Sequence, residues 1–432
     1  MADRTPARNE ATARSRSGRR AGLEVRDRVL LVAAGMASLL DSAAIVSVAS
    51  ALPLWRSTFD LNDLLVGVVS GAMTLSIAVG ALVGGRLSDR GSRTRVFSIS
   101  LVVYAAGAVV VAAAVGTTQL IVGVVILGAA GGADLPASIA LIADHAPLHA
   151  RARMVAATQV MWTLGVLVAS ALALVVAPYG TTGMRWVFLG LGALAVASVL
   201  VRWRSGAMKP GRLVESARTS GDEAGAAPES EVDRSGAADV LRISMGHRRE
   251  IVLVGAFYVL FTLVASTFGN FRTYVLVVTN ELAQTTATAV GFAATLIGLC
   301  GTVVFSAAAD THWRARTYPF GAVLLVVSPL MLAATGAERV GWTVAALVVF
   351  SLAHPFVGEA LYKVWSQERI PAPIRATTQG VTIAAARVAA AGFALVTPAL
   401  LSHSATILFG IVAVFAVAAV VVGRRVGRLP GE

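Results

Sequence analysis

The sequence predicts an all-α membrane protein whose twelve transmembrane helices form two pseudo-symmetric six-helix bundles. Composition is the first observation behind this prediction. Of the 432 residues, 56% are hydrophobic and only 14% are charged, whereas about a quarter of the residues in a soluble domain are charged. The second observation is that the apolar residues gather in long blocks, and the third is that the same loop motifs recur in both halves. The composition excludes a soluble globular protein, because its surface would be mostly apolar.

Twelve apolar stretches are long enough to cross a bilayer, since about 20 residues at about 1.5 Å per residue cover its hydrocarbon core. Helices are expected throughout, because the backbone polar groups of a span have no water to bond in lipid. The expected spans are 29–53, 64–85, 96–115, 120–143, 154–177, 186–201, 251–278, 286–309, 317–334, 341–365, 377–401 and 405–423.

A polar stretch separates the first six spans from the last six. It is rich in Gly, Ser, Pro and mixed charge, and it cannot bury enough apolar surface to fold alone. The expected division is a disordered basic cytoplasmic tail at 1–28, an N-terminal bundle at 29–201, a cytoplasmic linker at 202–250, a C-terminal bundle at 251–423 and a cytoplasmic tail at 424–432.

The basic residues predict the orientation, because cytoplasmic loops carry an excess of Lys and Arg. With the N-terminus inside, 30 of the 36 basic residues fall in cytoplasmic segments and three lie within spans. The remaining three, Arg56, Arg185 and Arg339, fall outside. We therefore expect a multi-pass protein of the cell (inner) membrane with both termini in the cytoplasm.

Two charged motifs recur in matching loops of the two halves. After spans two and eight, an aspartate is followed by arginines four and six residues later; after spans four and ten, an acid is followed by proline at +3 and arginine at +7. The first motif comprises Asp89, Arg93 and Arg95, then Asp310, Arg314 and Arg316; the second comprises Asp144, Pro147 and Arg151, then Glu368, Pro371 and Arg375. The nearly equal offsets, 221 and 224 residues, indicate a duplicated six-helix unit.

The stretch from Gly85 to Arg95 resembles the loop 2–3 signature of the major facilitator superfamily, with Ser92 where a glycine is usual. The acid–proline–arginine motifs resemble more specifically the sugar-porter branch, although Ala152 replaces a usual glycine and the proline–glutamate–serine–proline–arginine signature after span six is missing. The resemblance implies two six-helix bundles around a central cavity that opens alternately to each side of the membrane.

The charged loop motifs predict a latch between the cytoplasmic ends of the bundles, because carboxylates there can meet arginines and helix N-termini. Breaking the latch favours the inward-open state. The alternative is that these arginines only fix the topology. The candidate gating residues are Asp89, Arg90, Arg93, Asp144, Arg151, Asp310, Arg314, Glu368 and Arg375.

Asp41 is the first candidate for proton coupling, because it lies about twelve residues into span one, near mid-membrane. A charge at this depth is costly and marks a functional candidate. A carboxyl group holds its proton in apolar surroundings and releases it beside a cation, so it can carry a proton as the cavity switches sides. The resemblance implies the same role, since proton-coupled sugar porters often carry an aspartate in span one. A structural ion pair and a substrate ligand are the alternatives.

Asp134 is the second buried acid, in span four beside Pro136 and two glycines. The proline removes a helix hydrogen bond and the glycines permit close backbone approach, as expected for a bent helix beside a cavity. Sugar porters with an aspartate in span one often have an arginine in span four, so their ion pair does not carry over to this chain. Asp134 is expected to bind substrate or share the proton role; the alternative is a packed polar residue.

Three cations lie within spans. Arg272 follows Asn270 in span seven, where the family commonly places substrate contacts. Lys363 stands four residues after Glu359, so the two can pair on one helix face. Arg387 has no local acid, and we expect it to neutralise Asp41 or Asp134 across the bundle or to hold an anionic substrate.

Neutral polar side chains within spans complete the substrate-binding candidates: Gln159, Trp162, Asn270, Tyr274 and Gln379, with Arg272 and Arg387. Amides and indoles suit hydroxyl-rich ligands, although each such group can instead join two helices. Glycines spaced four apart are expected to be packing sites: Gly67 and Gly71, Gly80 and Gly84, and Gly128 and Gly132.

Other classes of function lack their residues. The two lysines, Lys209 and Lys363, do not follow glycine as a Walker A motif requires, and the six histidines show no metal-ligand spacing. We find no catalytic triad, so we expect no enzyme and no cofactor. The basic N-terminal tail has no aromatic residues among its arginines, which argues against nucleic acid as a partner.

The expected function is proton-coupled uptake of a sugar, polyol or similar small polar metabolite, so that the partners are a small-molecule substrate, protons and the lipid bilayer. Organic-anion uptake, with Arg272 or Arg387 binding the carboxylate, is one alternative. Proton-driven drug efflux is another, which the 6% aromatic content disfavours. A sensor that binds without transporting is a third. The sequence does not define the oligomeric state.

Overall fold

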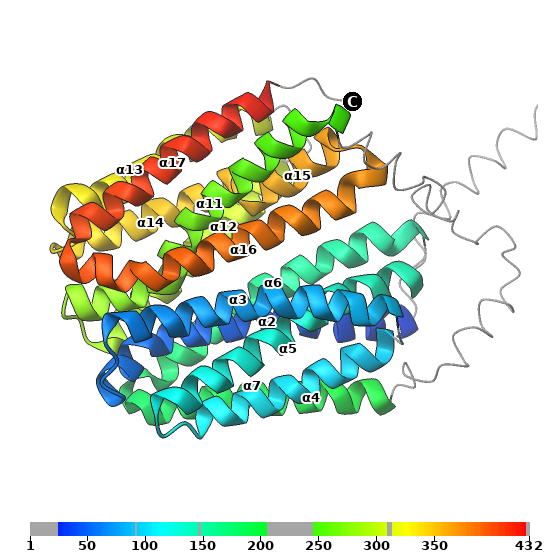
Figure 1. The fold of residues 1–432 in the computed structure, drawn as a ribbon, viewed down its shortest axis with the longest axis horizontal. Coiled ribbons are helices and arrows are strands. Elements are labelled where there is room, and N and C mark those ends of the chain that lie inside the picture. Colours follow the sequence, from blue (N-terminus) through cyan, green and yellow to red (C-terminus); the bar gives the residue numbers. More distant parts are fainter. Residues whose placement is uncertain (1–24, 91–92, 146–147, 205–244, 309–312, 429–432) are drawn as a thin grey trace, which may run out of the picture.

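The computed structural model describes residues 25–90, 93–145, 148–204, 245–308 and 313–428. Within these ranges, the side chains of 25–34, of 135–159 and of most residues in the charged loop motifs lie outside the description. The secondary structure of the described residues is entirely helical, and the helices run side by side along one axis (Figure 1). The first half of the chain forms one body of helices and the second half another.

The helices of the first half are α2 Val25–Thr58, α3 Asp63–Arg90, α4 Arg93–Ala112, α5 Thr117–His145, α6 Leu148–Val176, the short 3-10 helix η2 Ala177–Tyr179, and α7 Gly180–Arg204. Those of the second half are α11 Arg248–Tyr274, the π-helical turn η3 Val275–Thr279, α12 Gln284–Ala308, α13 Trp313–Thr335, α14 Val340–Val357, α15 Glu359–Arg369, α16 Ala372–His403 and α17 Ala405–Gly427. Most helices extend beyond the apolar blocks that predict them, because their polar end turns continue the same hydrogen bonding.

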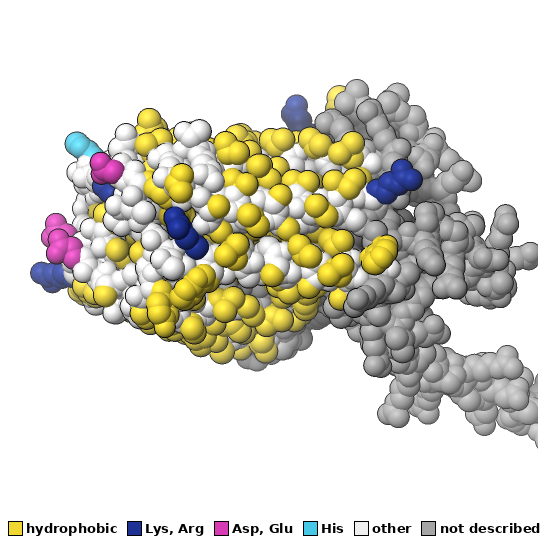
Figure 2. Space-filling view, turned by 90° about the horizontal axis from the view of Figure 1, so that it is seen from below, with side chains coloured by type: hydrophobic (Ala, Val, Ile, Leu, Met, Phe, Trp, Pro, Cys, Tyr) yellow, Lys and Arg dark blue, Asp and Glu magenta, His cyan; other side chains and the backbone are white. Residues whose placement is uncertain are grey.

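The described helices are apolar enough to lie in a membrane. Ten stretches have the length and hydropathy of a span; one of them, Val160–Val201, holds both α6 and α7, and α4 contributes the shorter apolar stretch Ser98–Ala112. Most of the surface between the two ends of the molecule is uncharged, and exposed hydrophobic side chains are spread across it (Figure 2). Such a surface is stable in lipid, not in water.

Each half packs as one bundle, and a few helices join the two bundles. In the first half α5 packs on α3 and α4, and α2 packs on α6; in the second, α13 packs on α14 and α11 on α16 and α17. The bundles meet where α3 packs on α16, α2 on α11 and α6 on α12. The predicted fold of two six-helix bundles is confirmed.

Glycines bring α3 and α5 into direct backbone contact. A Cβ atom added at Gly80 would lie 2.0 Å from the carbonyl oxygen of Ala129, and one added at Gly132 would lie 2.1 Å from that of Ile77. Only hydrogen fits in such spaces, so the predicted packing role of these glycines is confirmed. The close approach of the two helices also allows van der Waals contacts between their backbones, and such contacts drive helix association in lipid.

We expect Gly80→Ala to destabilise the first bundle by about 1–3 kcal/mol, the usual cost of overpacking, through the overlap with Ala129. The thermal unfolding midpoint of the purified protein in detergent measures the effect. Gly190→Ala on α7 is the matched control, because an added Cβ there has no neighbour within 4 Å. Equal midpoints for the two variants would contradict the role of the α3–α5 crossing.

The tenth expected span, 341–365, is not one continuous helix. It is divided into α14 and α15 at Gly358, whose φ of −94° and ψ of −151° are extended. Pro355 lies in the last turn of α14, and its ring cannot donate the helical hydrogen bond. The expectation of one unbroken helix was therefore wrong, and the break places Glu359 at the first turn of a new helix.

Candidate functional site

The two bundles are joined at one end of the molecule, which we call the Arg56 end after the residue that lies there. Arg56, at the end of α2, forms an ion pair with Asp63 of α3 at 3.0 Å. Its guanidinium also contacts the hydroxyl of Tyr274 and lies 5.5 Å from the centre of that ring. Because Tyr274 belongs to α11, Arg56 connects the first bundle to the second.

Further contacts close the same end. Gln284, in the first turn of α12, donates a hydrogen bond of 2.8 Å to the backbone oxygen of Ser50 on α2. Gly67 of α3 touches α16 so closely that an added Cβ would lie 2.3 Å from the oxygen of Leu395. We call the contacts of Arg56 with Tyr274 and of Gln284 with Ser50 the polar clasp. The backbone contact of Gly67 with Leu395 is the α3–α16 seam.

We expect Arg56→Gln to open the Arg56 end more often, and by more than Asp63→Asn does, because only Arg56 touches the other bundle. The partly buried ion pair contributes about 0.2–1 kcal/mol, and the cation–π contact contributes a similar amount. The labelling rate of Ser70→Cys, introduced in a Cys300→Ser background, measures this opening, since Ser70 is buried and lines a cavity between the bundles. Equal rates for the two variants would assign the effect to the ion pair alone.

Asp41 lies deep in the first bundle, where its side chain is 2% exposed. Its neighbours come from three helices: a Cβ added at Gly131 of α5 would lie 3.6 Å from its Oδ1, Tyr104 of α4 lies next to it, and the indole of Trp162 on α6 lies beside the carboxylate. Neither carboxylate oxygen accepts a well-formed hydrogen bond from the described residues. A buried carboxylate in this state is costly.

Arg387 of α16 supplies the cation that acts on Asp41 from the second bundle. The two side chains form no ion pair within 4 Å among the described residues. The interaction between them is a longer-range electrostatic attraction. Arg387 also acts on Glu359, which pairs with Lys363 on α15 at 2.9 Å. The predicted Glu359–Lys363 pair is confirmed.

Asp134 lies in a different setting. Its Oδ1 accepts a hydrogen bond of 3.0 Å from Ser100 of α4, within its own bundle, and its side chain is 2% exposed. Among the described residues, no hydrogen bond joins it to Asp41.

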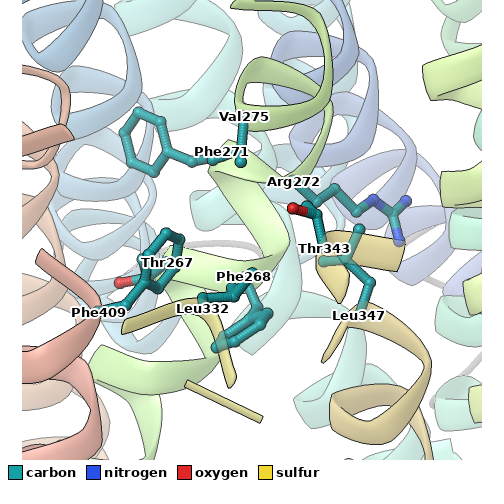
Figure 3. A pocket seen from close by; sticks show the side chains of 9 residues that line it. All are labelled: Thr267, Phe268, Phe271, Arg272, Val275, Leu332, Thr343, Leu347 and Phe409. Carbon is teal, nitrogen blue, oxygen red and sulfur yellow. The ribbon is translucent and has the colours of Figure 1, made fainter. Parts of the chain in front are cut away.

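Arg272 connects the two bundles near the Arg56 end. Its Nη1 donates to Thr295 Oγ1 of α12 at 3.1 Å, and its Nη2 donates to Ser170 Oγ of α6 at 3.5 Å. Figure 3 shows this side chain leaving α11 on the side opposite to Phe271. The guanidinium therefore points away from the core of the second bundle and toward the first.

The neutral candidates lie in separate places. Asn270 lines a cavity of about 10 Å³ with Ser70 and Thr74 of α3, so it faces the other bundle. A second cavity of about 10 Å³, lined mainly by apolar side chains of the second bundle, lies beside Phe268 and Phe409 (Figure 3). Each of these two cavities has room for about one water molecule.

Of the remaining candidates, Tyr274 takes part in the clasp with Arg56, and Gln379 donates to Ser366 Oγ at 2.6 Å. The side chain of Gln159 on α6 lies outside the described part of the chain. The same holds for all the candidate gating residues except Glu368, which lies in the last turn of α15.

Sequence reasoning left Arg56 and Glu359 out of the candidate site. Arg56 entered only as a charge on the outer side, and Glu359 only as the partner of Lys363. The helix spacing predicted the local pair, but the link from Glu359 to Arg387 depends on how α15 packs against α16. No signal in the sequence could have found that contact.

The fold and the charged groups between the bundles define a membrane transporter, not an enzyme. Residues 31–395 match the Major Facilitator Superfamily, and the chain belongs to this family of secondary transporters. The minor myo-inositol transporter IolF of Bacillus subtilis is 27% identical over 376 residues, which cover 86% of this chain and 84% of that protein. The arabinose-proton symporter of Escherichia coli is 33% identical over 138 residues, 32% of this chain and 29% of that one.

Among solved structures, the chain resembles the inward-open conformation of the xylose transporter XylE from E. coli. The TM-score is 0.72 at 16% identity, and the match covers 94% of this chain and 97% of the other. At that identity the likeness concerns the fold, and it agrees with the two-bundle architecture described above.

Proposed function

We propose that this chain carries out proton-coupled uptake of a sugar, polyol or similar small polar metabolite by alternating access. The observation that carries the proposal is the position of Asp41: a buried carboxylate without a well-formed hydrogen bond, exposed to the charge of a cation on the opposite bundle. The names of the relatives, a myo-inositol transporter and an arabinose-proton symporter, support the substrate class and the coupling ion.

Alternating access gives Asp41 a proton cycle. When the bundles bring Arg387 close, the carboxylate is stabilised as an anion; when they separate the two groups, a buried anion becomes costly and protonation relieves the cost. Glu359 is the second partner of Arg387 and can hold it while Asp41 is protonated. Binding and release of the proton are thereby tied to the movement of the bundles.

The proposed orientation follows from the distribution of the arginines. It places the Arg56 end on the outer side of the cell membrane. Both termini and the charged loop motifs then lie on the cytoplasmic side. The domain division then stands as proposed: bundles at 29–201 and 251–423, joined by a cytoplasmic linker at 202–250. In this orientation the clasp closes the outer side, and the loop residues such as Asp89 and Glu368 form the inner gate.

Purified protein in liposomes that contain a pH-sensitive dye tests the proposal. Addition of myo-inositol, arabinose or another polyol is expected to acidify the interior, with one proton entering for each solute. Entry of labelled solute without acidification would contradict proton coupling and indicate that the protein is a facilitator. Absence of any solute entry across a panel of sugars and polyols would remove the substrate class.

A further inference from the structure

Arg272 has no acidic partner among the described residues, unlike three other cations within or beside the spans. Arg56 pairs with Asp63, Lys363 pairs with Glu359, and Arg387 acts on Asp41 and Glu359. Among the described residues, Arg272 forms no ion pair, and its side-chain hydrogen-bond partners are hydroxyl groups. A partly buried cation without an anion is unfavourable, which indicates that the anion comes from outside the protein.

The partners that Arg272 does have are hydroxyl groups. Thr295 and Ser170 accept hydrogen bonds from its two terminal nitrogens, but neither carries a charge. Their role is to hold the guanidinium in place, since an arginine fork has five N–H donors and these two bonds leave others for a ligand. The side chain is therefore oriented but not neutralised.

A glycine lets the backbone of α12 approach the guanidinium closely. A Cβ added at Gly291 of α12 would lie 3.3 Å from Nε of Arg272, a distance at which one of the two must shift. Thr295 lies one helical turn further along α12. The guanidinium therefore lies against the backbone of Gly291 and the hydroxyl group of Thr295 on the same face of that helix.

The position of Arg272 suits a transported solute. The guanidinium is attached to α11 and α12 of one bundle and reaches Ser170 on α6 of the other. A ligand held here touches both bundles, so its binding changes the balance between their arrangements, as alternating access requires. Asn270 also faces the first bundle, but toward α2 and α3, where it lines a separate small cavity.

We propose that Arg272, positioned by Ser170 and Thr295, binds a carboxylate group of the transported solute, and that the preferred substrate is a polyhydroxylated monocarboxylate of the sugar-acid type. One uncompensated cation matches one negative charge, and the guanidinium fork matches the two oxygens of a carboxylate. This inference rests on the proposed function, and it narrows the substrate class within it.

Two pairs of solutes test the inference. In glucuronate a carboxylate replaces the hydroxymethyl group of glucose, and quinate is a cyclohexane polyol that carries a carboxylate and fewer hydroxyls than myo-inositol. Binding to the full-length protein in detergent is measured by calorimetry. Charged hydrogen bonds contribute enough that the acid of at least one pair is expected to bind roughly tenfold to hundredfold more tightly than its neutral partner. Arg272→Gln is expected to remove that preference, and Arg272→Lys to retain part of it.

Arg185→Gln is the control for loss of one positive charge, because Arg185 lies at the Arg56 end and bonds only to the backbone oxygen of Ala114 among the described residues. It is expected to keep the preference. Equal or tighter binding of the neutral partners by the wild type overturns the inference, whether or not Arg272→Gln folds, and leaves the proposed function intact. Acid binding without proton movement in liposomes supports the inference and contradicts proton coupling. If none of the four solutes binds, both the inference and the proposed substrate class are contradicted.

Discussion

Asp41→Asn is expected to abolish proton-driven accumulation of substrate while leaving exchange of substrate across the membrane intact. Asparagine keeps the size and shape of the side chain but neither binds nor releases a proton. The variant resembles the protonated carboxyl group, so the bundles still exchange arrangements when loaded with solute. Net accumulation against a gradient requires release of the proton, which the variant cannot perform.

The measurement uses reconstituted liposomes with two readouts. An imposed proton gradient drives accumulation of labelled solute, and preloaded unlabelled solute drives exchange without a gradient. We expect accumulation to fall by at least about tenfold, a change of roughly 1.4 kcal/mol or more in driving force, with exchange near the wild-type rate. Loss of both activities would instead indicate that Asp41 is a structural residue or a substrate ligand.

Asp134→Asn provides the matched control, because Asp134 is equally buried but accepts a hydrogen bond from Ser100 within its own bundle. That bond does not depend on how the two bundles are placed. We therefore expect Asp134→Asn to retain accumulation, and its loss would show that the two acids share the proton role.

The sequence predicted those features that depend on local spacing. Helix-forming apolar blocks predicted the order of the helices, four-residue glycine spacing predicted packing sites without their partner helices, and the Glu359–Lys363 pair follows from one helical turn. The break before α15 was also readable, because Pro355 and Gly358 are both present in the expected span. The expected span is one long apolar block, and hydropathy alone cannot register a change in backbone angles.

The site depended on packing between helices far apart in the chain. Arg56 meets Tyr274 across 218 positions of sequence, and Arg272 meets Ser170 across 102. Each of these residues is recognisable as polar in an apolar block, but which partner it meets is set by the rotation and depth of two helices. Sequence spacing therefore proposed the candidates and could not assign their partners.

Gly67→Ala is expected to trap the transporter with the Arg56 end open. The added methyl group would lie 2.3 Å from the oxygen of Leu395 and 2.9 Å from that of Ala394, and these are backbone atoms that cannot rotate away. Because α3 and α16 belong to different bundles, the overlap penalises the arrangement in which the Arg56 end is closed, and each bundle can still fold. Overpacking of this kind costs about 1–3 kcal/mol, which corresponds to a shift of roughly 5–150-fold in the balance between arrangements.

Two measurements separate trapping from unfolding. The labelling rate of Ser70→Cys in the Cys300→Ser background is expected to rise by that factor, while the thermal midpoint in detergent stays near the wild-type value. Gly392→Ala, also on the α3–α16 pair, is the control, since its Cβ meets nothing within 4 Å and both changes raise helix propensity equally. A slower or unchanged labelling rate in Gly67→Ala would mean that the α3–α16 seam does not part during transport, and the polar clasp at Arg56 would then have to open by movement of α11 alone.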